Sequence, residues 1–153
     1  MIVLIADVLL LDMKYTRDAR FVTNRQVLDH LRIQSTPVSI TCHTLLEILG
    51  VACFNSSAKA LRDLADEIPV DYGLIVLPAP AFDLIYAGLD YQAVRDRIAT
   101  RLSIGDAVTA LQIEPFIPTA TTLLTWNARH FRGKLSIPVL TPEEGWQQNQ
   151  PAT

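Results

Sequence analysis

The stretch that decides the fold is Ile2-Val3-Leu4-Ile5, which is apolar at every position. A strand with one face in water alternates apolar and polar residues, whereas a strand covered by helices on both faces is apolar throughout. The run therefore predicts a buried strand of a parallel sheet. We expect residues 1–11 to form this buried strand, because they lack the basic start and cleavage site of a secretion signal and are about half the length of a membrane span.

Strand-like and helix-like patterns alternate along the rest of the chain. Strands are expected at residues 37–41, 73–77, 121–125 and 137–140, and helices at residues 18–32, 44–51, 57–68, 81–87, 91–102 and 103–112. A short final helix is expected from Pro142, since Thr141 can cap it and a Glu stands at its third position. This alternation predicts an α/β fold, a three-layer α/β/α sandwich around a central, mostly parallel sheet. Residues 1–146 would form one domain and residues 147–153 a flexible tail.

The totals fit a single cytoplasmic domain. Of the 153 residues, 50% are hydrophobic and 19% charged, which allows a sizeable core and argues against disorder. Cys42 and Cys53 are too few for a disulfide framework, so a reducing cytoplasm is expected, with Cys42 packed at a strand-to-helix junction. The net charge of −3 gives no general attraction for nucleic acid. That counts less against a nuclease that holds cations between its carboxylates and its substrate.

Polar side chains follow several of the predicted strands. Ligands of open parallel sheets bind beyond the carboxyl ends of the strands. Asp7, Glu47 and Asn127 follow the first, second and fourth predicted strands, and Asp106 begins the helix before the fourth. Carboxylates gathered at one edge repel each other unless a cation lies among them, and oxygen ligands select Mg²⁺ or Mn²⁺. Such an ion could polarise a phosphodiester and lower the pKa of a water molecule.

Structural explanations remain open for the same residues. Residues 103–106 and 44–47 each fit a capping box, in which Asp106 and Glu47 would stabilise the start of a helix. Asp7 lies among apolar neighbours, where an unpaired charge is costly, so it either caps a turn or belongs to a site. The capping and metal-binding interpretations are compatible, because a first-turn carboxylate can face both a helix amide and a cation.

Other polar residues are expected outside the site. Asp12 is interpreted as turn surface and His130 as a packing or surface residue, and the other two histidines show no pattern. Arg129, Arg132 and Lys134 are interpreted as solvated surface, with phosphate contacts as the alternative.

Five blocks of the chain together resemble the PIN-domain family. They are residues 3–10, 41–50 (where Ile-Leu-Gly follows Glu47), 103–107, 124–131 and 137–142, in the family's order over nearly the whole chain. The resemblance implies a metal-dependent ribonuclease, commonly the VapC-like toxin of a toxin–antitoxin pair. It also implies a homodimer that a small antitoxin protein inhibits, with RNA as the substrate. By this resemblance Glu47 and Asp106 would hold Mg²⁺ or Mn²⁺, and Asn127 would support the site.

The chain departs from the family pattern at one position. Aligned on Val8-Leu9-Leu10, the family's first metal-binding Asp falls on Ile5, and Asp7 stands where the family often has Asn, Ser or Asp. In an active ribonuclease, Asp7, Glu47 and Asp106 would ligate one or two ions. The alternatives are a PIN-like binding module without catalysis and an unrelated α/β enzyme with an apolar pocket and few acids. Whether Asp7 points into the same pocket as the other two acids distinguishes the first two hypotheses.

Overall fold

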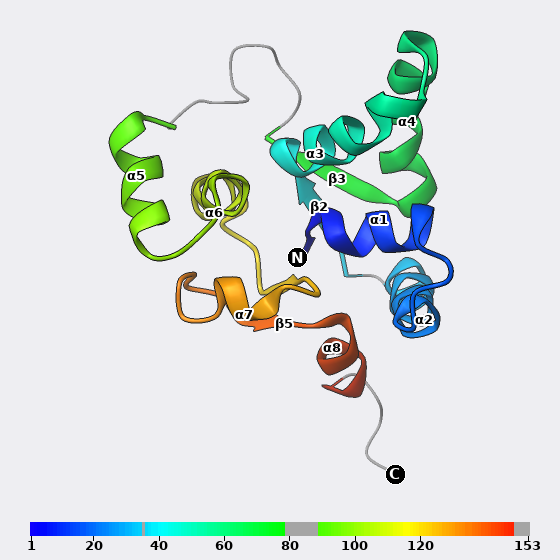
Figure 1. Cartoon of the computed structure of the whole chain (residues 1–153). Helices are drawn as coiled ribbons and strands as arrows, with labels where there is room; N and C mark the ends of the chain where they lie inside the picture. The colour runs from blue at the N-terminus through cyan, green and yellow to red at the C-terminus, as the bar shows by residue number, and fades with distance from the viewer. Residues whose placement is uncertain (35, 79–88, 149–153) are drawn as a thin grey trace.

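The computed structural model describes residues 1–34, 36–78 and 89–148 (Figure 1). The expected helix at residues 81–87 lies outside this part of the chain. The strands are β1 (Ile2–Leu4), β2 (Val38–Thr41), β3 (Leu74–Leu77), β4 (Thr122–Leu124) and β5 (Val139–Leu140). The α-helices are α1 (Ala6–Lys14), α2 (Phe21–Ile33), α3 (Cys42–Ala52), α4 (Ala58–Tyr72), α5 (Tyr91–Ala99), α6 (Ile104–Phe116), α7 (Ala128–Phe131) and α8 (Pro142–Gln148), and a 3₁₀ turn, η1 (Cys53–Asn55), follows α3.

The five strands form one parallel sheet in the order β3-β2-β1-β4-β5. The first strand of the chain is therefore the central one. Val3 and Leu4 are fully buried there, as the continuous apolar run predicts. All carboxyl ends of the strands point to one edge, so the segments after β1, β2 and β4 meet there.

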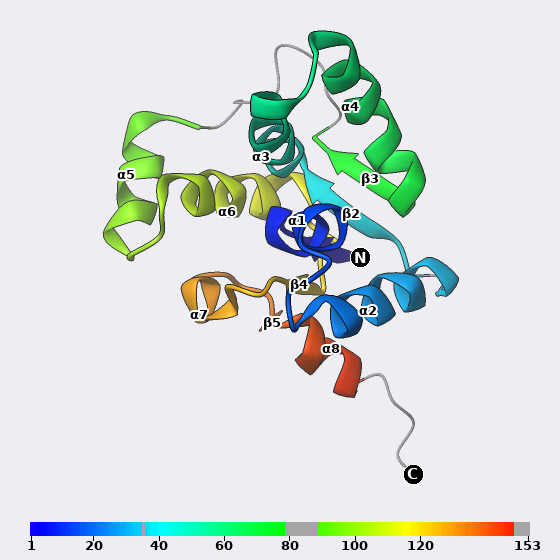
Figure 2. The same ribbon diagram turned by 45° about the vertical axis from the view of Figure 1, so that its right-hand side comes forward.

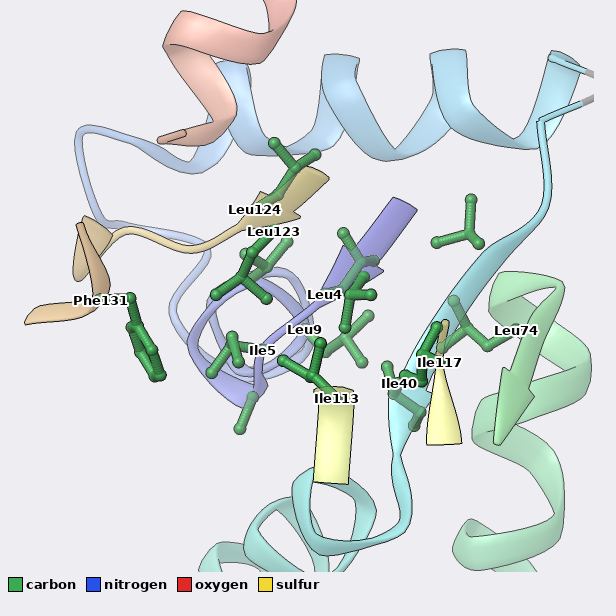
Figure 3. Packing of buried hydrophobic residues seen from close by; sticks show 14 of the residues in the cluster. Leu4, Ile5, Leu9, Ile40, Leu74, Ile113, Ile117, Leu123, Leu124 and Phe131 are labelled. Atoms are coloured by element: carbon green, nitrogen blue, oxygen red, sulfur yellow. The ribbon is translucent and has the colours of Figure 1, made fainter. Parts of the chain in front are cut away.

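Helices cover both faces of the sheet, which confirms the predicted three-layer α/β/α sandwich. Figure 3 shows α2 and α8 on one side of the strands and Ile113 and Ile117 of α6 on the other. The second view separates α2 and α8 from the α5–α6 pair (Figure 2). Among the described residues, no helix has the length and apolar character that crossing a membrane requires.

The first eleven residues depart from the prediction. The strand ends at Leu4, and α1 begins two residues later, so the interpretation of residues 1–11 as one strand is wrong beyond that point. The reason is that α1 is itself buried: Val8, Leu9 and Leu11 pack in the interior, and a continuous apolar run does not distinguish a buried strand from a buried helix. The short α7 was also not expected. At the other end, α8 includes Gln147 and Gln148.

Candidate active site

Asp7 lies in the first turn of α1, directly beyond the carboxyl end of β1. Its Oδ2 accepts hydrogen bonds from the hydroxyl of Thr125 (2.8 Å) and from the backbone N–H of Asn127 (3.1 Å), both just after β4. Its buried Oδ1 has no hydrogen-bond partner within the described residues. Burial raises the pKa of the Asp7 carboxyl, and the hydrogen bonds from Thr125 and Asn127 oppose that rise.

A cleft of about 350 Å³ opens beside Asp7. It is lined by Asp7, Leu10, Leu11, Tyr15, Asp18, Arg20, Trp126 and Asn127. Arg20 lies over the ring of Trp126, 5.4 Å from its centre, and forms a two-fold hydrogen-bonded ion pair with Asp18. The indole N–H of Trp126 donates to the buried Asn24, whose amide in turn donates to the carbonyl of Val8. The wall of the cleft is therefore fixed to α1 and α2.

Glu47 lies in the middle of α3 and not in its first turn. Thr41 caps the helix and accepts from the backbone N–H of Thr44, so the interpretation of Glu47 as a capping residue is wrong. Glu47 Oε1 lies 3.6 Å from Nε2 of His43, one helical turn earlier. The same oxygen lies against Gly105 of α6, where a Cβ atom would stand 2.6 Å from it. A glycine at this position gives the Glu47 carboxylate its space.

Asp106 is the third residue of α6, next to Gly105. Its backbone N–H donates to the hydroxyl of Ser103, which confirms the predicted cap of this helix. Its Oδ2 lies 3.5 Å from Nδ1 of His130 on α7. The cap thus uses the backbone of Asp106 and leaves its half-buried carboxylate facing α7.

The predicted residues therefore meet at one edge of the sheet, in two pairs. Asp7 and Asn127 line the cleft beyond β1 and β4, whereas Glu47 lies against Gly105 of α6 and the next residue, Asp106, turns its carboxylate toward His130. Within the described chain, no three His, Cys, Asp or Glu side chains stand close enough to hold one metal ion together. Two carboxylates still suit a hard cation, because Mg²⁺ keeps several water ligands and is commonly bound through one or two carboxylates.

Ile5, at the family's first acidic position, belongs to the core. It is 6% exposed, precedes α1, and packs in the cluster that contains Leu9 and Phe131 (Figure 3). Its backbone N–H donates to the carbonyl of Leu124, which fixes the end of β1 beside β4. This position therefore contributes an apolar side chain and no ligand.

Two residues outside the expected set need correction or addition. Asp12 was expected on the surface but is buried, and it accepts hydrogen bonds from Arg25 (2.8 Å) and from the hydroxyl of Tyr72 (2.7 Å). His43 was not predicted as a site residue and contacts Glu47. The four-residue spacing of His43 and Glu47 is the signal that would have indicated it, since such residues share one face of a helix.

The basic residues near α7 are largely engaged within the protein. Arg132 pairs with Glu144 and donates to the carbonyl of Val139, and Lys134 donates to the carbonyl of Arg101. Arg129 is exposed.

Comparisons with known proteins show the fold. No protein-family model and no curated protein matches the chain. A chain of "VapBC2 from Rickettsia felis bound to a DNA fragment from their promoter" is similar in structure, with a TM-score of 0.58 and 14% identity over 92% of this chain and 98% of that one. A chain of "FitAB bound to IR36 DNA fragment" is similar with a TM-score of 0.56 and 18% identity over 94% and 96%. The chain therefore has the α/β, PIN-like fold that the sequence predicts.

Proposed function

We propose that the chain is a metal-dependent endoribonuclease of the PIN type and the toxin component of a toxin–antitoxin pair. The observation that carries the proposal is that Asp7 follows β1 directly, and that Glu47 of α3 lies against Gly105, the residue before Asp106, in a fold built on a parallel sheet. This edge is where ligands of such folds bind. The likeness to chains of VapBC2 and FitAB complexes supports the same class of protein.

In this proposal Glu47 and Asp106 hold Mg²⁺ or Mn²⁺. The ion would supply the positive charge that polarises a phosphodiester and makes the attacking water more acidic. Asp7 is the third acidic group at this edge: Thr125 and Asn127 hold its Oδ2, and its buried Oδ1 has no hydrogen-bond partner among the described residues. Its raised pKa suits a group that accepts a proton. Hydrolysis then adds the water across one P–O bond of the RNA.

The test is cleavage of a labelled single-stranded RNA by the pure protein with Mn²⁺, with Mg²⁺ and with EDTA. We expect cleavage that EDTA abolishes and that Asp106→Asn lowers at least about a hundredfold, since a metal contributes several kcal/mol to the transition state. Asp63→Asn is the matched control, because the side chain of Asp63 on α4 is 46% exposed and pairs with the exposed Lys59. Cleavage that survives both EDTA and Asp106→Asn would overturn the proposal.

A second function has its own supporting observation. Ile5 is buried in the core, and the cleft beside Asp7 is lined by Asn127 but by neither Glu47 nor Asp106. This separation favours a PIN-like binding module without catalysis. Such a module would stay folded and bind its partner, but it would not cleave RNA with any of the metals.

The small-molecule enzyme has weaker support. A pocket of about 250 Å³ lies between α2 and α8, lined by Val27, Leu31, Trp146 and their neighbours. It includes Ile2 and Thr122, which begin β1 and β4, so it lies at the amino ends of the strands. Catalytic sites of parallel sheets lie at the opposite end.

We also propose an antitoxin protein and a second copy of this chain as partners, in the cytoplasm. The likeness to chains of the VapBC2 and FitAB complexes, both bound to DNA, supports such a protein partner. Light scattering of the purified chain tests the homodimer: a mass of one chain at micromolar concentration would contradict it.

A further inference from the structure

We propose that His43 is a metal ligand beside Glu47 and that the site therefore prefers a first-row transition-metal cation to Mg²⁺. This inference rests on the proposed function, because it concerns the ion of the same site. It places the ion between the imidazole of His43 and the carboxylate of Glu47, in a chain where Ile5 provides no acid.

The spacing of the two side chains fits one shared cation. Nε2 of His43 and Oε1 of Glu47 are 3.6 Å apart, too far for a hydrogen bond of ordinary length. Two ligand atoms at about 2.1 Å from one cation stand about 3.0 Å apart in an octahedral arrangement and about 3.4 Å apart in a tetrahedral one. The pair is thus close to the separation that one ion between them requires.

The two ring nitrogens of His43 make no hydrogen bond within the described residues. Neither Nδ1 nor Nε2 is exposed. Buried imidazole nitrogens without partners are costly, and a metal ion satisfies such a nitrogen. Packing alone would be served better by an apolar side chain.

The backbone of His43 is fixed from two directions. Thr41 caps α3 directly before it, and the His43 N–H donates to Oε1 of Gln112 on α6 at 3.1 Å. A Cβ at Gly105 would lie 3.7 Å from His43 Nε2, so the glycine keeps the space in front of the ring open as well as that of Glu47. The pair therefore faces α6, where Asp106 follows Gly105.

Imidazole distinguishes between the candidate ions. Mg²⁺ takes oxygen ligands, whereas imidazole suits borderline cations whose affinity rises from Mn²⁺ through Co²⁺ to Ni²⁺. Replacing the ring should therefore weaken the binding of these ions and leave Mg²⁺ nearly unchanged.

The experiment measures dissociation constants of Mn²⁺, Ni²⁺ and Mg²⁺ by calorimetry for the wild type, His43→Gln and His30→Gln. His30 is the matched control, because it lies on α2 at the amino end of the sheet. We expect His43→Gln to weaken the binding of Ni²⁺ at least about tenfold and the binding of Mg²⁺ less than about twofold. His30→Gln should change neither affinity. Equal losses for Ni²⁺ and Mg²⁺, or no loss for either, would overturn the inference.

Pulsed electron paramagnetic resonance of Mn²⁺ bound to the wild-type protein is a second test, and it does not depend on whether a variant folds. A coordinated ¹⁴N signal supports the inference, and bound Mn²⁺ without that signal overturns it while leaving the proposed function standing. A nitrogen signal in a protein that cleaves no RNA would overturn the proposed function alone. If the protein binds no cation at all, both the inference and the proposed function are overturned.

Discussion

Gly105 is the residue whose missing side chain matters most to the site. In Gly105→Ala the new Cβ would stand 2.6 Å from Glu47 Oε1, and that carboxylate, at the end of a flexible side chain, would move away. We expect the protein to fold with its stability unchanged or raised by up to about 1 kcal/mol, because alanine favours a helix. Metal affinity and RNA cleavage should fall about tenfold, as measured by calorimetry and by the RNA assay.

Gly50→Ala is the control for that substitution. Gly50 lies in α3, and a Cβ there would meet nothing within 4 Å. It should gain helix stability in the same way without a change in metal affinity. Equal metal affinity in both variants would show that Glu47 does not need the space at Gly105.

At the residue scale, the positions of the acidic residues were easier to predict than the side chains that contact them. Asp7 and Glu47 lie near the predicted edge of the sheet because position after a strand is visible in the pattern, and Asp106 because it begins the helix that leads into β4. His43 was missed, since a lone histidine gives no signal until the start of α3 at Cys42 is known. Asp12 was missed because its partners, Arg25 and Tyr72, lie 13 and 60 residues away.

Among the elements, three helices depend on one carboxylate. Asp12 of α1, with a side chain 3% exposed, accepts from Arg25 of α2 and Tyr72 of α4. Asp12→Ala should lower the free energy of unfolding by about 2–4 kcal/mol, because it leaves the hydroxyl of Tyr72 and one side of Arg25 without their acceptor. Tyr72→Phe, which removes one hydrogen bond, should cost about 1 kcal/mol. Urea unfolding measures both, and a smaller loss for Asp12→Ala than for Tyr72→Phe would contradict this account.

The start of a helix was predicted well where a few neighbouring residues determine it. The final helix begins at Pro142, and Thr141 and Glu144 exchange hydrogen bonds between side chain and backbone, the capping box read from four residues. The start of α3 was placed at Thr44, two residues late, because Thr41 and Thr44 both fit a cap and only the end of β2 decides between them. Helix α1 could not be separated from β1, since burial removed the polar residues that would show its period.

For the whole molecule, the net charge of −3 limits the electrostatic attraction for RNA. Two phosphate contacts would weaken the binding of a single strand only about sevenfold between 50 and 200 mM salt. Fluorescence anisotropy with an Asp7→Asn variant, which removes the proposed proton acceptor and leaves both proposed metal ligands in place, measures this dependence. A fall of about a hundredfold would require some five contacts and would contradict a binding mode that relies on the cation and the cleft.

The position of β1 in the middle of the sheet also governs when the site can exist during synthesis. Asp7 accepts hydrogen bonds from Thr125 and Asn127, which lie 118 and 120 residues further along the chain. A ribosome delivers the amino end first, so a growing polypeptide carries Asp7 long before these groups emerge. A ribonuclease built in this way would stay harmless to the message that encodes it until Thr125 and Asn127 have left the ribosome.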